Sequence, residues 1–495
     1  MADAWGAAQR RARHLHGNAR PRRHQCVGGL HVARQDSIPM ILFIGQVQSE
    51  AREREAFQEI EYRRAFTEVA KWVGEIDDPA RIPEFVTRAF AVATSGRPGP
   101  VVLTLPEDML TRSAEAPAAK PYQPVEGHPG PSQIKQLGAL LEGAKRPIAI
   151  LGGTRWTADS VAEFQRFAER WSLPVGCSFR RQMLFDHLHP NYAGDVGIGI
   201  NPALAKEIKE ADLVLLVGGR FSEMPSSGYT LMDAPYPRQT LVHVHPDASE
   251  LGRVYRPELP IAASPRDFVT ALEGLAPAAE PVWSARTRAM HEGYLKWSTP
   301  PETGPGDVRM GPIMNWIEAN TPEDTIFTNG AGNYATWVHR FHRFRRYATQ
   351  AAPASGSMGY GLPAAVAAKH LHPDREVICF AGDGCFLMHG QEFATAVRYR
   401  LPIITVVVNN GIYGTIRMHQ ERDYPGRVSA TDLTNPDFAA LARAYGGHGE
   451  TVEKTEEFAD AFLRARASGK PAIIEIKLDP EAITPTRTLS EIRKG

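Results

Sequence analysis

The chain has 495 residues, which is enough for two to four domains of ordinary size. Its 56 basic and 56 acidic residues cancel, so bulk charge gives no reason to expect a nucleic acid or a membrane surface as partner. No apolar stretch reaches the roughly 18 residues of a membrane span, and four Cys are too few for a disulfide scaffold, so we expect a cytoplasmic protein.

The first 34 residues differ in composition from the rest of the chain. They contain seven Arg and one acidic residue, Asp3, and the first Glu of the chain is Glu50. A transit peptide is also Arg-rich and acid-poor, although the Ser content and the amphipathic period of such a peptide are lacking here. A disordered basic tail is a second interpretation, and an error of reading frame, argued below, is the third.

The first block of regular structure follows this segment. Apolar runs at 38–44 and 99–106 predict strands that are buried on both faces. The charged residues 50–72 and the segment 83–93 predict helices. Residues 113–132 are rich in Ala and Pro and predict a linker.

The second block alternates strands and helices, as parallel α/β domains do. Strands are expected at 147–153, 212–218 and 240–245, and helices at 162–171 and 202–210. A second linker-like region then covers residues 275–306.

The third block repeats this alternation more strongly. Its expected strands are 325–328, 376–381, 403–408 and 472–478, and its expected helices are 361–370, 390–399 and 438–445. The fold class is therefore α/β, with three doubly wound parallel-sheet domains, and ligands in such sheets bind beyond the carboxyl ends of the strands.

One segment of the third block carries recognisable chemistry, AGDGCFLMHGQEFATAVRYRLPIITVVVNNGIYG at residues 381–414. Asp383 ends one strand and Asn410 ends the next, and a right-handed crossover brings these two ends side by side. A carboxylate and an amide oxygen in that position suit Mg²⁺, while Gly382 and Gly384 allow the backbone to approach a phosphate. The sequence therefore predicts a magnesium and diphosphate site at one edge of the sheet.

This pattern resembles the thiamin-diphosphate-dependent family of acetolactate synthase, pyruvate decarboxylase and benzoylformate decarboxylase. The resemblance extends over residues 30–485. It implies thiamin diphosphate and Mg²⁺ as cofactors, with Asp383, Asn410 and the backbone carbonyl of Ile412 as metal ligands.

The resemblance also implies three domains. They are an incomplete pyrimidine-binding domain at 1–112, a central Rossmann-like domain at 133–275, and a domain at 307–482 that binds thiamin diphosphate and Mg²⁺.

Further cofactor contacts are implied by two other segments. Residues 357–363 resemble the family segment whose large apolar residue wedges between the two cofactor rings, and Met358 takes that place. Residues 328–337 resemble the diphosphate loop, with Asn333 and Tyr334 in place of the usual Gln-His pair. The cofactor-binding residues implied in this way are Gly332, Asn333, Tyr334, Ser357, Met358, Gly382, Asp383, Gly384, Cys385, Asn410, Ile412, Tyr413 and Gly414.

Three residues are candidates for contact with the reacting groups. Phe57 and Gln58 resemble a Phe-Gln pair near the active site of acetolactate synthases, and an exposed helix face is the alternative. His419 stands where those enzymes have a Trp that helps to select 2-oxobutyrate as acceptor. A polar contact with substrate and a plain surface position are equally compatible with His419.

The second block resembles the flavin-binding domain of acetolactate synthases at residues 218–221. Residues 222–224, Ser-Glu-Met, replace the usual Asp-Asp-Arg, and His243-Val244-His245 replaces Asp-x-Asp. Both differences count against FAD, which the resemblance would otherwise imply. His243 and His245 project to the same side of a strand, where a surface or packing role is favoured over a metal pair.

The family reaction depends on a Glu ahead of a Gly-Pro-Gly-Ala-Thr-Asn loop, and the sequence has neither. That Glu holds a proton on the cofactor ring, so that the ring can deprotonate the thiazolium C2. A permitted codon choice for residues 20–27, shifted by one base, reads Gly-Pro-Gly-Ala-Thr-Asn-Ala, and residues 1–6 resemble the segment just after the family Glu. We therefore hypothesise a frame error between Ala7 and Gly28, which makes residues 1–29 aberrant and leaves the activity of this chain in doubt.

The residues and the resemblance together predict an enzyme that depends on thiamin diphosphate and Mg²⁺. It would decarboxylate a 2-oxo acid and transfer the acyl or aldehyde fragment to an acceptor, as acetolactate synthase does. The alternatives are a decarboxylase of the benzoylformate decarboxylase type, a non-catalytic paralogue without the activating Glu, and a nucleotide-dependent oxidoreductase. In the family the cofactor bridges two subunits, so a homodimer or homotetramer is implied, with a small-molecule substrate and neither nucleic acid nor membrane as partner.

Overall fold

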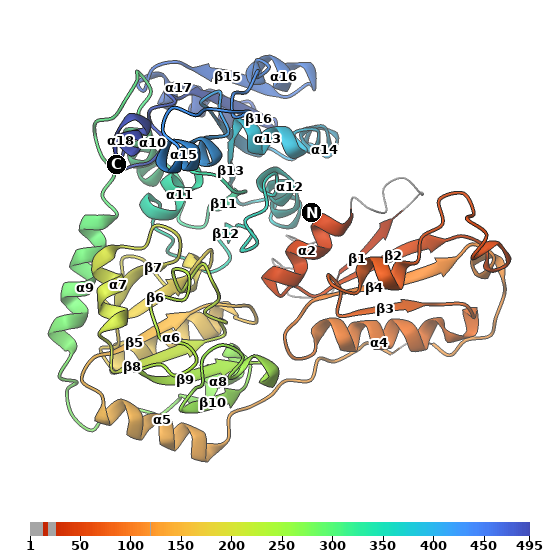
Figure 1. Cartoon of the computed structure of the whole chain (residues 1–495), viewed down its shortest axis with the longest axis horizontal. Helices are drawn as coiled ribbons and strands as arrows, with labels where there is room; N and C mark the ends of the chain where they lie inside the picture. Colours follow the sequence, from red (N-terminus) through yellow and green to blue (C-terminus); the bar gives the residue numbers. More distant parts are fainter. Residues whose placement is uncertain (1–12, 18–25, 119) are drawn as a thin grey trace.

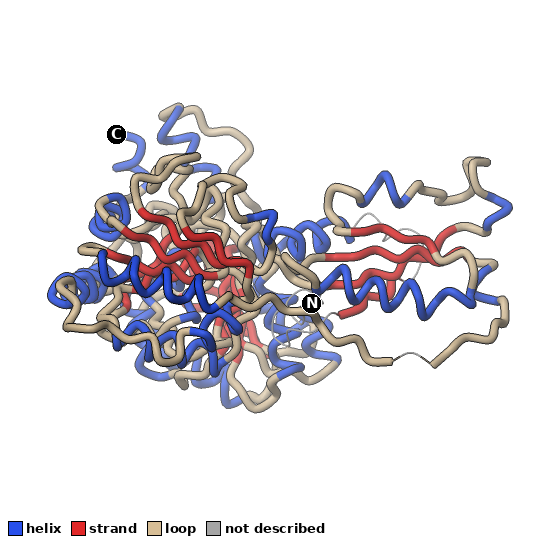
Figure 2. The backbone as a smooth tube through the Cα atoms, turned by 90° about the horizontal axis from the view of Figure 1, so that it is seen from below, coloured by secondary structure: helices blue, strands red, loops and turns tan. Residues whose placement is uncertain are grey.

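The structure is a computed structural model that describes residues 13–17, 26–118 and 120–495. Figure 1 shows three α/β bodies, the first at the right, the second at the lower left and the third at the upper left. All strand pairs of the three described sheets are parallel. Figure 2 shows these strands running alongside one another with helices on the outside of each body. The predicted α/β class is confirmed.

The first body contains a four-stranded sheet of order β1-β2-β4-β3. Its elements are β1 (Arg13–Gly17), α2 (Cys26–Asp36), β2 (Met40–Gln46), α3 (Tyr62–Phe66), β3 (Trp72–Glu75), α4 (Ile82–Thr94) and β4 (Pro100–Pro106). β2 and β4 pair along their whole length, and nearly every residue of both is buried, as the apolar runs predict. The hypothesised frame error falls mostly on residues 1–12 and 18–25, outside the described residues.

The predicted helix at 50–72 is wrong. Within it only Tyr62–Phe66 is α-helical, and most of the segment is turn and loop. The Glu59 carboxylate accepts hydrogen bonds from the backbone N–H groups of Glu53 at 2.7 Å and Ala56 at 3.0 Å. These side-chain hydrogen bonds replace the backbone hydrogen bonds of a helix and stabilise a loop instead. Glu53 also adopts a φ of 59°, a value that does not occur in an α-helix.

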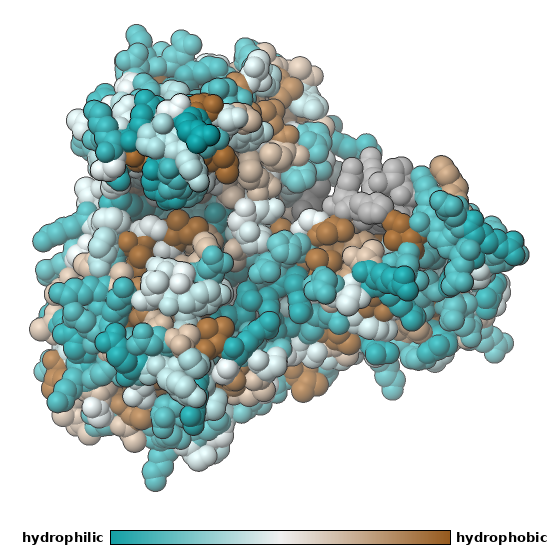
Figure 3. Space-filling view, in the orientation of Figure 1, coloured by the Kyte–Doolittle hydropathy of each residue, from teal (hydrophilic) through white to brown (hydrophobic). Residues whose placement is uncertain are grey.

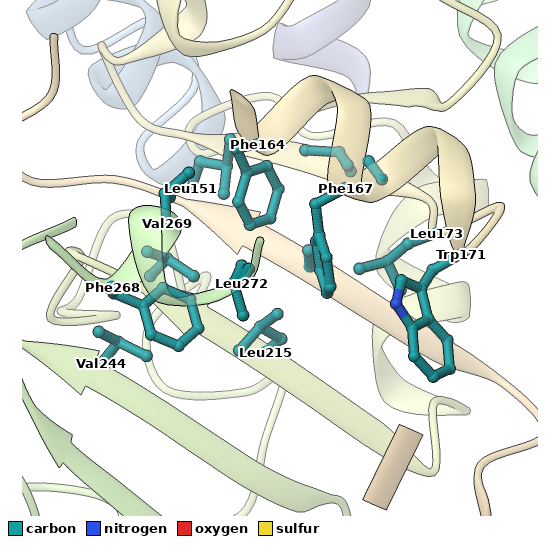
Figure 4. Close-up of a cluster of buried hydrophobic side chains, with 14 of the residues drawn as sticks. Leu151, Phe164, Phe167, Trp171, Leu173, Leu215, Val244, Phe268, Val269 and Leu272 are labelled. Carbon is teal, nitrogen blue, oxygen red and sulfur yellow. The ribbon is translucent and has the colours of Figure 1, made fainter. Parts of the chain in front are cut away.

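The second body contains a six-stranded sheet of order β10-β9-β8-β5-β6-β7. Its elements are α5 (Pro131–Gly143), β5 (Pro147–Leu151), α6 (Ala158–Arg170), β6 (Val175–Ser178), β7 (Tyr192–Val196), α7 (Pro202–Lys209), β8 (Leu213–Val217), β9 (Thr240–His245), β10 (Leu259–Ala262), α8 (Pro265–Ala271) and α9 (Ser284–Trp297). Figure 4 shows Phe164 and Phe167 of α6 packed against Leu215 of β8 and Phe268 of α8. Each such buried side chain contributes about 1.5–3 kcal/mol to stability.

The composition of the segment 275–306 predicts a linker, but the segment contains the helix α9. Trp283 Nε1 donates to the Trp171 carbonyl at 2.9 Å, and Arg286 forms an ion pair with Glu207. These contacts fix α9 to the second body. The helix buries only three side chains, so it lacks the apolar stripe by which a sequence reveals a helix.

The third body contains a six-stranded sheet of order β12-β11-β13-β14-β16-β15. Its elements are α10 (Met310–Asn320), β11 (Ile326–Asn329), α11 (Ala335–Phe341), β12 (Gln350–Ala351), α12 (Gly361–Leu371), β13 (Val377–Gly382), α13 (Asp383–His389), α14 (Glu392–Arg398), β14 (Ile404–Asn409), α15 (Gly414–Asp423), α16 (Phe438–Ala444), β15 (His448–Val452), α17 (Glu457–Ala467), β16 (Ala472–Lys477) and α18 (Leu489–Lys494). The chain runs from β11 outward to β12 and returns to β13 on the other side of β11. This reversal of strand order creates a crevice at the carboxyl ends of β11 and β13.

Short 3-10 turns complete the described secondary structure at Ser49–Ala51, Pro79–Arg81, Met109–Thr111, Gln182–Leu184 and Ala248–Glu250. Figure 3 shows that the face seen in Figure 1 is mostly hydrophilic, with small and scattered apolar patches. Among the described residues, none of the helices combines the length and the apolar character that crossing a membrane requires.

Candidate cofactor site

A cavity of about 250 Å³ lies beyond the carboxyl ends of β11, β13 and β14. We call it the glycine-turn cavity, because the Gly382–Gly384 turn forms one wall and the loops 331–334 and 410–416 form others. All the cofactor residues predicted from the sequence line this cavity, with the exception of Ser357. Three loops that are far apart in the sequence therefore meet at the switch point of the third sheet.

Asp383 is the charged residue of this cavity, and it is only 3% exposed. Its Oδ1 accepts a hydrogen bond from the N–H of Gly384, and its Oδ2 accepts from the N–H of Gly411 and from Asn435 Nδ2, each at 2.8 Å. Burial raises the pKa of Asp383, and the three donors act in the opposite direction. A divalent cation beside the carboxylate would supply the charge that these neutral donors do not.

The two Asn residues of the Asn-Asn-Gly turn have different surroundings. Asn409 is buried in the sheet, where its Nδ2 donates to Glu475 at 2.6 Å and its Oδ1 accepts from Asn435 at 2.8 Å. Asn410 instead lines the glycine-turn cavity, and its Oδ1 accepts a long hydrogen bond of 3.3 Å from the N–H of Ile412. Of the two Asn residues, only the second therefore lines the cavity.

Ile412 lies in an isolated antiparallel bridge with Asp432. The hydrogen bonds of that bridge come from its neighbours: Tyr413 N–H donates to Thr431, and the Gly411 carbonyl accepts from Leu433, each at 2.8 Å. In the part of the chain that the structure describes, no cluster of three His, Cys, Asp or Glu suits a metal. The ligands that the resemblance implies, one carboxylate, one amide and one backbone carbonyl, form an all-oxygen set that fits Mg²⁺.

Two aromatic rings explain why the turn contains glycine at both positions. A Cβ on Gly382 would lie 2.8 Å from Cδ1 of Tyr334, and a Cβ on Gly384 would lie 2.6 Å from Cε1 of Tyr413. The Tyr334 hydroxyl in turn lies 3.1 Å from Cys385 Sγ. Burial, together with the nearby thiol, raises the pKa of Tyr334 well above its ordinary value, so this hydroxyl is a neutral group.

The loop that resembles the diphosphate loop is tied to α15. Asn333 Oδ1 accepts from Thr415 Oγ1 at 2.9 Å, and Asn333 N–H donates to the same hydroxyl at 3.1 Å. Met358 is half-buried against the core of the third body and lines the cavity, while Ser357 lies just outside it. The predicted wedge and diphosphate loop thus face the same space.

A larger cavity of about 1010 Å³ is lined mostly by the second and third bodies, together with His31 and Gln35 of the first, and we call it the interdomain cavity. It shares Gly332, Asn333 and Thr415 with the glycine-turn cavity, so the two spaces adjoin. His419 is exposed and lines the interdomain cavity. Charged and titratable side chains that the motifs do not identify line it as well, among them Arg180, Asp195 and His339. They meet because segments of different domains converge, which no signal in the sequence indicates.

Phe57 and Gln58 lie in the first body and line neither the interdomain nor the glycine-turn cavity. The Phe57 side chain is 77% exposed, in a loop and not on the helix face that was the alternative for these residues. A single copy of the described chain therefore does not bring these two residues to the predicted cofactor.

His243 and His245 are both buried on β9, and their ring centroids are 6.1 Å apart. His243 Nε2 is bonded to the Gly219 carbonyl at 2.9 Å, and His245 Nδ1 accepts from the Asp247 N–H at 3.0 Å. Burial lowers the pKa of each to about 4. Of the surface and packing roles favoured for them, the surface role is wrong, because both rings are buried, neutral and bonded to the backbone.

Comparison with known proteins supports a thiamin diphosphate site, as this geometry does. Residues 330–476 match the family described as thiamine pyrophosphate enzyme, C-terminal TPP binding domain, and residues 134–272 match its central domain. The chain is 30% identical over 488 residues to the acetolactate synthase large subunit of Parasynechococcus marenigrum, covering 96% of this chain and 78% of that protein. It is 31% identical to the acetolactate synthase large subunit of Corynebacterium glutamicum, covering 91% and 74%, and 30% identical to the probable large subunit of Methanocaldococcus jannaschii, covering 93% and 80%.

The chain therefore belongs to the thiamine pyrophosphate enzymes. Within that family it is an enzyme of the acetolactate synthase-like group, as the resemblance of its motifs predicts.

Proposed function

We propose that this enzyme uses thiamin diphosphate and Mg²⁺ to decarboxylate a 2-oxo acid and to transfer the resulting fragment to an acceptor. The observation that carries the proposal is the placement of Asp383, Asn410 and Ile412 around one cavity at the switch point of the third sheet. Their carboxylate, amide and carbonyl oxygens are the hard ligands that Mg²⁺ takes beside a diphosphate.

The cofactor would supply a thiazolium carbon that attacks the 2-oxo acid and accepts electrons as CO₂ leaves. The protein's part is to hold and to orient. Asp383 and Asn410 would hold the metal, Asn333 would hold the diphosphate loop against α15, and Met358 would pack against the cofactor rings. Gly384 would let the diphosphate approach the backbone directly.

We also propose that two copies of the chain form the working unit. Phe57 and Gln58 lie away from the cofactor residues of their own chain, and an aromatic ring as exposed as that of Phe57 is common at protein interfaces. A second copy would then bring its first body to the glycine-turn cavity. The state, dimer or tetramer, is measured by light scattering with and without the cofactor.

Flavin remains a separate question for the interdomain cavity. The replacement of Asp-Asp-Arg by Ser222-Glu223-Met224 counts against it, and all three residues line this cavity. The visible absorption spectrum of the purified protein decides the matter, since a bound flavin absorbs near 450 nm.

The test of the proposed function has two stages. Isothermal titration calorimetry first measures thiamin diphosphate binding with and without Mg²⁺, and we expect Mg²⁺ to tighten it. Pyruvate consumption and the formation of CO₂ and acetolactate are then followed. Binding without turnover would favour the non-catalytic paralogue, and release of a free aldehyde without a condensation product would favour the simple decarboxylase.

A further inference from the structure

Arg180, the second residue after β6, has an unusual environment within the interdomain cavity. It is 5% exposed, and its Nη1 donates to the carbonyl of Gly330 at 2.6 Å. Its Nε is buried and has no hydrogen-bond partner. The residue also adopts a φ of 59°, a left-handed conformation that a side chain other than Gly adopts only where the surroundings enforce it.

The charge of Arg180 is not neutralised by a contacting carboxylate of the described chain. Asp36 and Asp195 are the carboxylates that interact with it electrostatically, and neither forms an ion pair with it. Asp36 Oδ1 instead accepts from the Ala354 N–H at 2.7 Å. Burial raises the pKa of Asp195 to about 7, so a large fraction of this carboxyl is neutral at physiological pH. Burying a guanidinium without a counter-charge is costly, and an anionic ligand would remove that cost.

The other Arg residues that line the cavity also have partners. Arg220 Nη2, for example, donates to the Gln35 carbonyl at 2.9 Å. Arg340 Nε donates to the Trp297 carbonyl at 2.9 Å, and Arg253 is paired with Glu250 at 3.3 Å and is largely exposed. Burial, with a further contribution from Arg180, lowers the pKa of His339 well below its ordinary value. Unlike Arg220 and Arg340, Arg180 is buried and has an Nε without a hydrogen-bond partner, so it is the cation in this corner that an anion would contact.

Arg180 also lies next to the predicted cofactor. The Gly330 carbonyl that it contacts belongs to the residue whose N–H donates to the Tyr334 hydroxyl at 3.0 Å. Tyr334 is a wall of the glycine-turn cavity. An anion held by Arg180 would thus sit where the two cavities meet, within reach of a small molecule that reacts at the cofactor.

We infer that Arg180 is the anchor for the carboxylate of a 2-oxo acid substrate, with Asp195 forming the opposite wall of the same subsite. A planar guanidinium matches a carboxylate in two parallel hydrogen bonds. A phosphate group is disfavoured, because one guanidinium supplies few of the donors that it needs. This inference rests on the proposed function for the identity of the substrate, but the subsite itself can be tested without the cofactor.

The experiment compares two probes of nearly equal shape, pyruvate and the uncharged 2,3-butanedione, in the full chain without thiamin diphosphate. Saturation-transfer NMR on their methyl protons measures both dissociation constants. We expect R180Q to weaken pyruvate binding at least about tenfold and to leave butanedione binding unchanged. R180K keeps the charge but loses the two-pronged geometry, so its affinity for pyruvate should lie between those of the unmodified chain and R180Q. R253Q is the matched control in the same cavity, and we expect it to leave the binding of both probes unchanged.

Three outcomes overturn the inference. One is equal binding of pyruvate and butanedione to the unmodified chain, and another is an equal loss of both probes in R180Q, which would mark a structural role. The third is an Arg180-dependent binding of inorganic phosphate that is tighter than that of pyruvate, which would assign the subsite to a phosphate group. Calorimetry with thiamin diphosphate, run in parallel, reports separately on the proposed function. If the chain does not bind thiamin diphosphate but prefers pyruvate in an Arg180-dependent way, the proposed function is wrong and the inferred anion subsite stands.

Discussion

The carboxylate of Asp36, at the end of α2 in the first body, accepts a hydrogen bond of 2.7 Å from the backbone N–H of Ala354 in the third body. The two residues are 318 positions apart in the sequence. Ala354 begins the segment that leads to Met358, the predicted wedge of the cofactor. The first body is thus bonded, within a single chain, to the loop of the third body that carries the predicted cofactor wedge.

Removing this contact should loosen the loop 354–358. In D36A the Ala354 N–H loses its partner, and such a loss costs about 1–3 kcal/mol, more when the acceptor carries a charge. We expect faster hydrogen exchange at residues 354–358 and weaker thiamin diphosphate binding. D36N keeps an oxygen acceptor, so its hydrogen exchange and its thiamin diphosphate affinity should be close to those of the unmodified chain. Unchanged exchange in D36A, measured against the distant strand β15 as internal reference, would contradict this role.

The Gly384 position should tolerate no side chain. A Cβ there would lie 2.6 Å from Cε1 and 2.9 Å from Cδ1 of Tyr413, so the ring must move into the glycine-turn cavity or the turn must shift. We expect G384A to lose about 1–3 kcal/mol of unfolding free energy and at least tenfold in thiamin diphosphate affinity. G293A in α9 is the matched control, since nothing lies within 4 Å of its added Cβ. Equal urea midpoints for both variants would show that the close packing is unimportant.

The fold and the third-body site follow from the sequence to different degrees. Buried strands such as β4 and β14 are continuous apolar runs, and Asp383 and Asn410 end neighbouring strands, so their proximity follows from the right-handed crossover. The helix predicted at 50–72 was wrong because the Glu59 side chain accepts hydrogen bonds from the backbone of its own loop. Helix propensity does not account for such a contact.

Contacts between domains were beyond the reach of the sequence. Arg180 follows a short strand without any motif, and its meeting with Gly330 depends on how the second and third bodies pack. The hydrogen bond between Asp36 and Ala354 has the same origin. Periodicity and spacing describe neighbours along one sheet, but the relative placement of two sheets depends on surface complementarity spread over many residues.

The proposed metal site makes a prediction about Mg²⁺. Asp383 is the carboxylate among the three proposed ligands, so D383N should remove most of the electrostatic attraction for a divalent cation. We expect Mg²⁺ to tighten thiamin diphosphate binding at least 100-fold in the unmodified chain and by much less in D383N, both measured by calorimetry with and without EDTA. D374N, an exposed change in the same body, should keep the full effect. A Mg²⁺ effect of the same size in D383N and in the unmodified chain would rule out this ligand.

The buried carboxyl of Asp195 should make stability fall as pH rises. Its pKa is about 7 in the folded chain and about 3.8 when unfolded, so between these values the folded state binds more protons than the unfolded state. The contribution of Asp195 to stability is therefore largest below pH 4, declines through the window to pH 7 and is constant above it. The other groups that interact with it are Arg180, Cys177, Tyr192 and Tyr294; burial raises the pKa of Cys177 and of both Tyr, so these stay neutral in this window.

The variant D195N isolates this effect, because its amide does not titrate. Urea unfolding followed by Trp fluorescence at pH 5 and pH 8 measures the free energy of unfolding of both chains. We expect the free energy of D195N to rise relative to that of the unmodified chain as pH rises, by at most about 4 kcal/mol over the whole window. D233N is the control for a general change of charge, since Asp233 is 63% exposed and its pairing with Arg238 at 3.0 Å lies at the surface. If the difference between D195N and the unmodified chain is the same at both pH values, the carboxyl titrates normally. In that case Asp195 is an ionised partner of Arg180, and the subsite proposed for the substrate carboxylate is already filled.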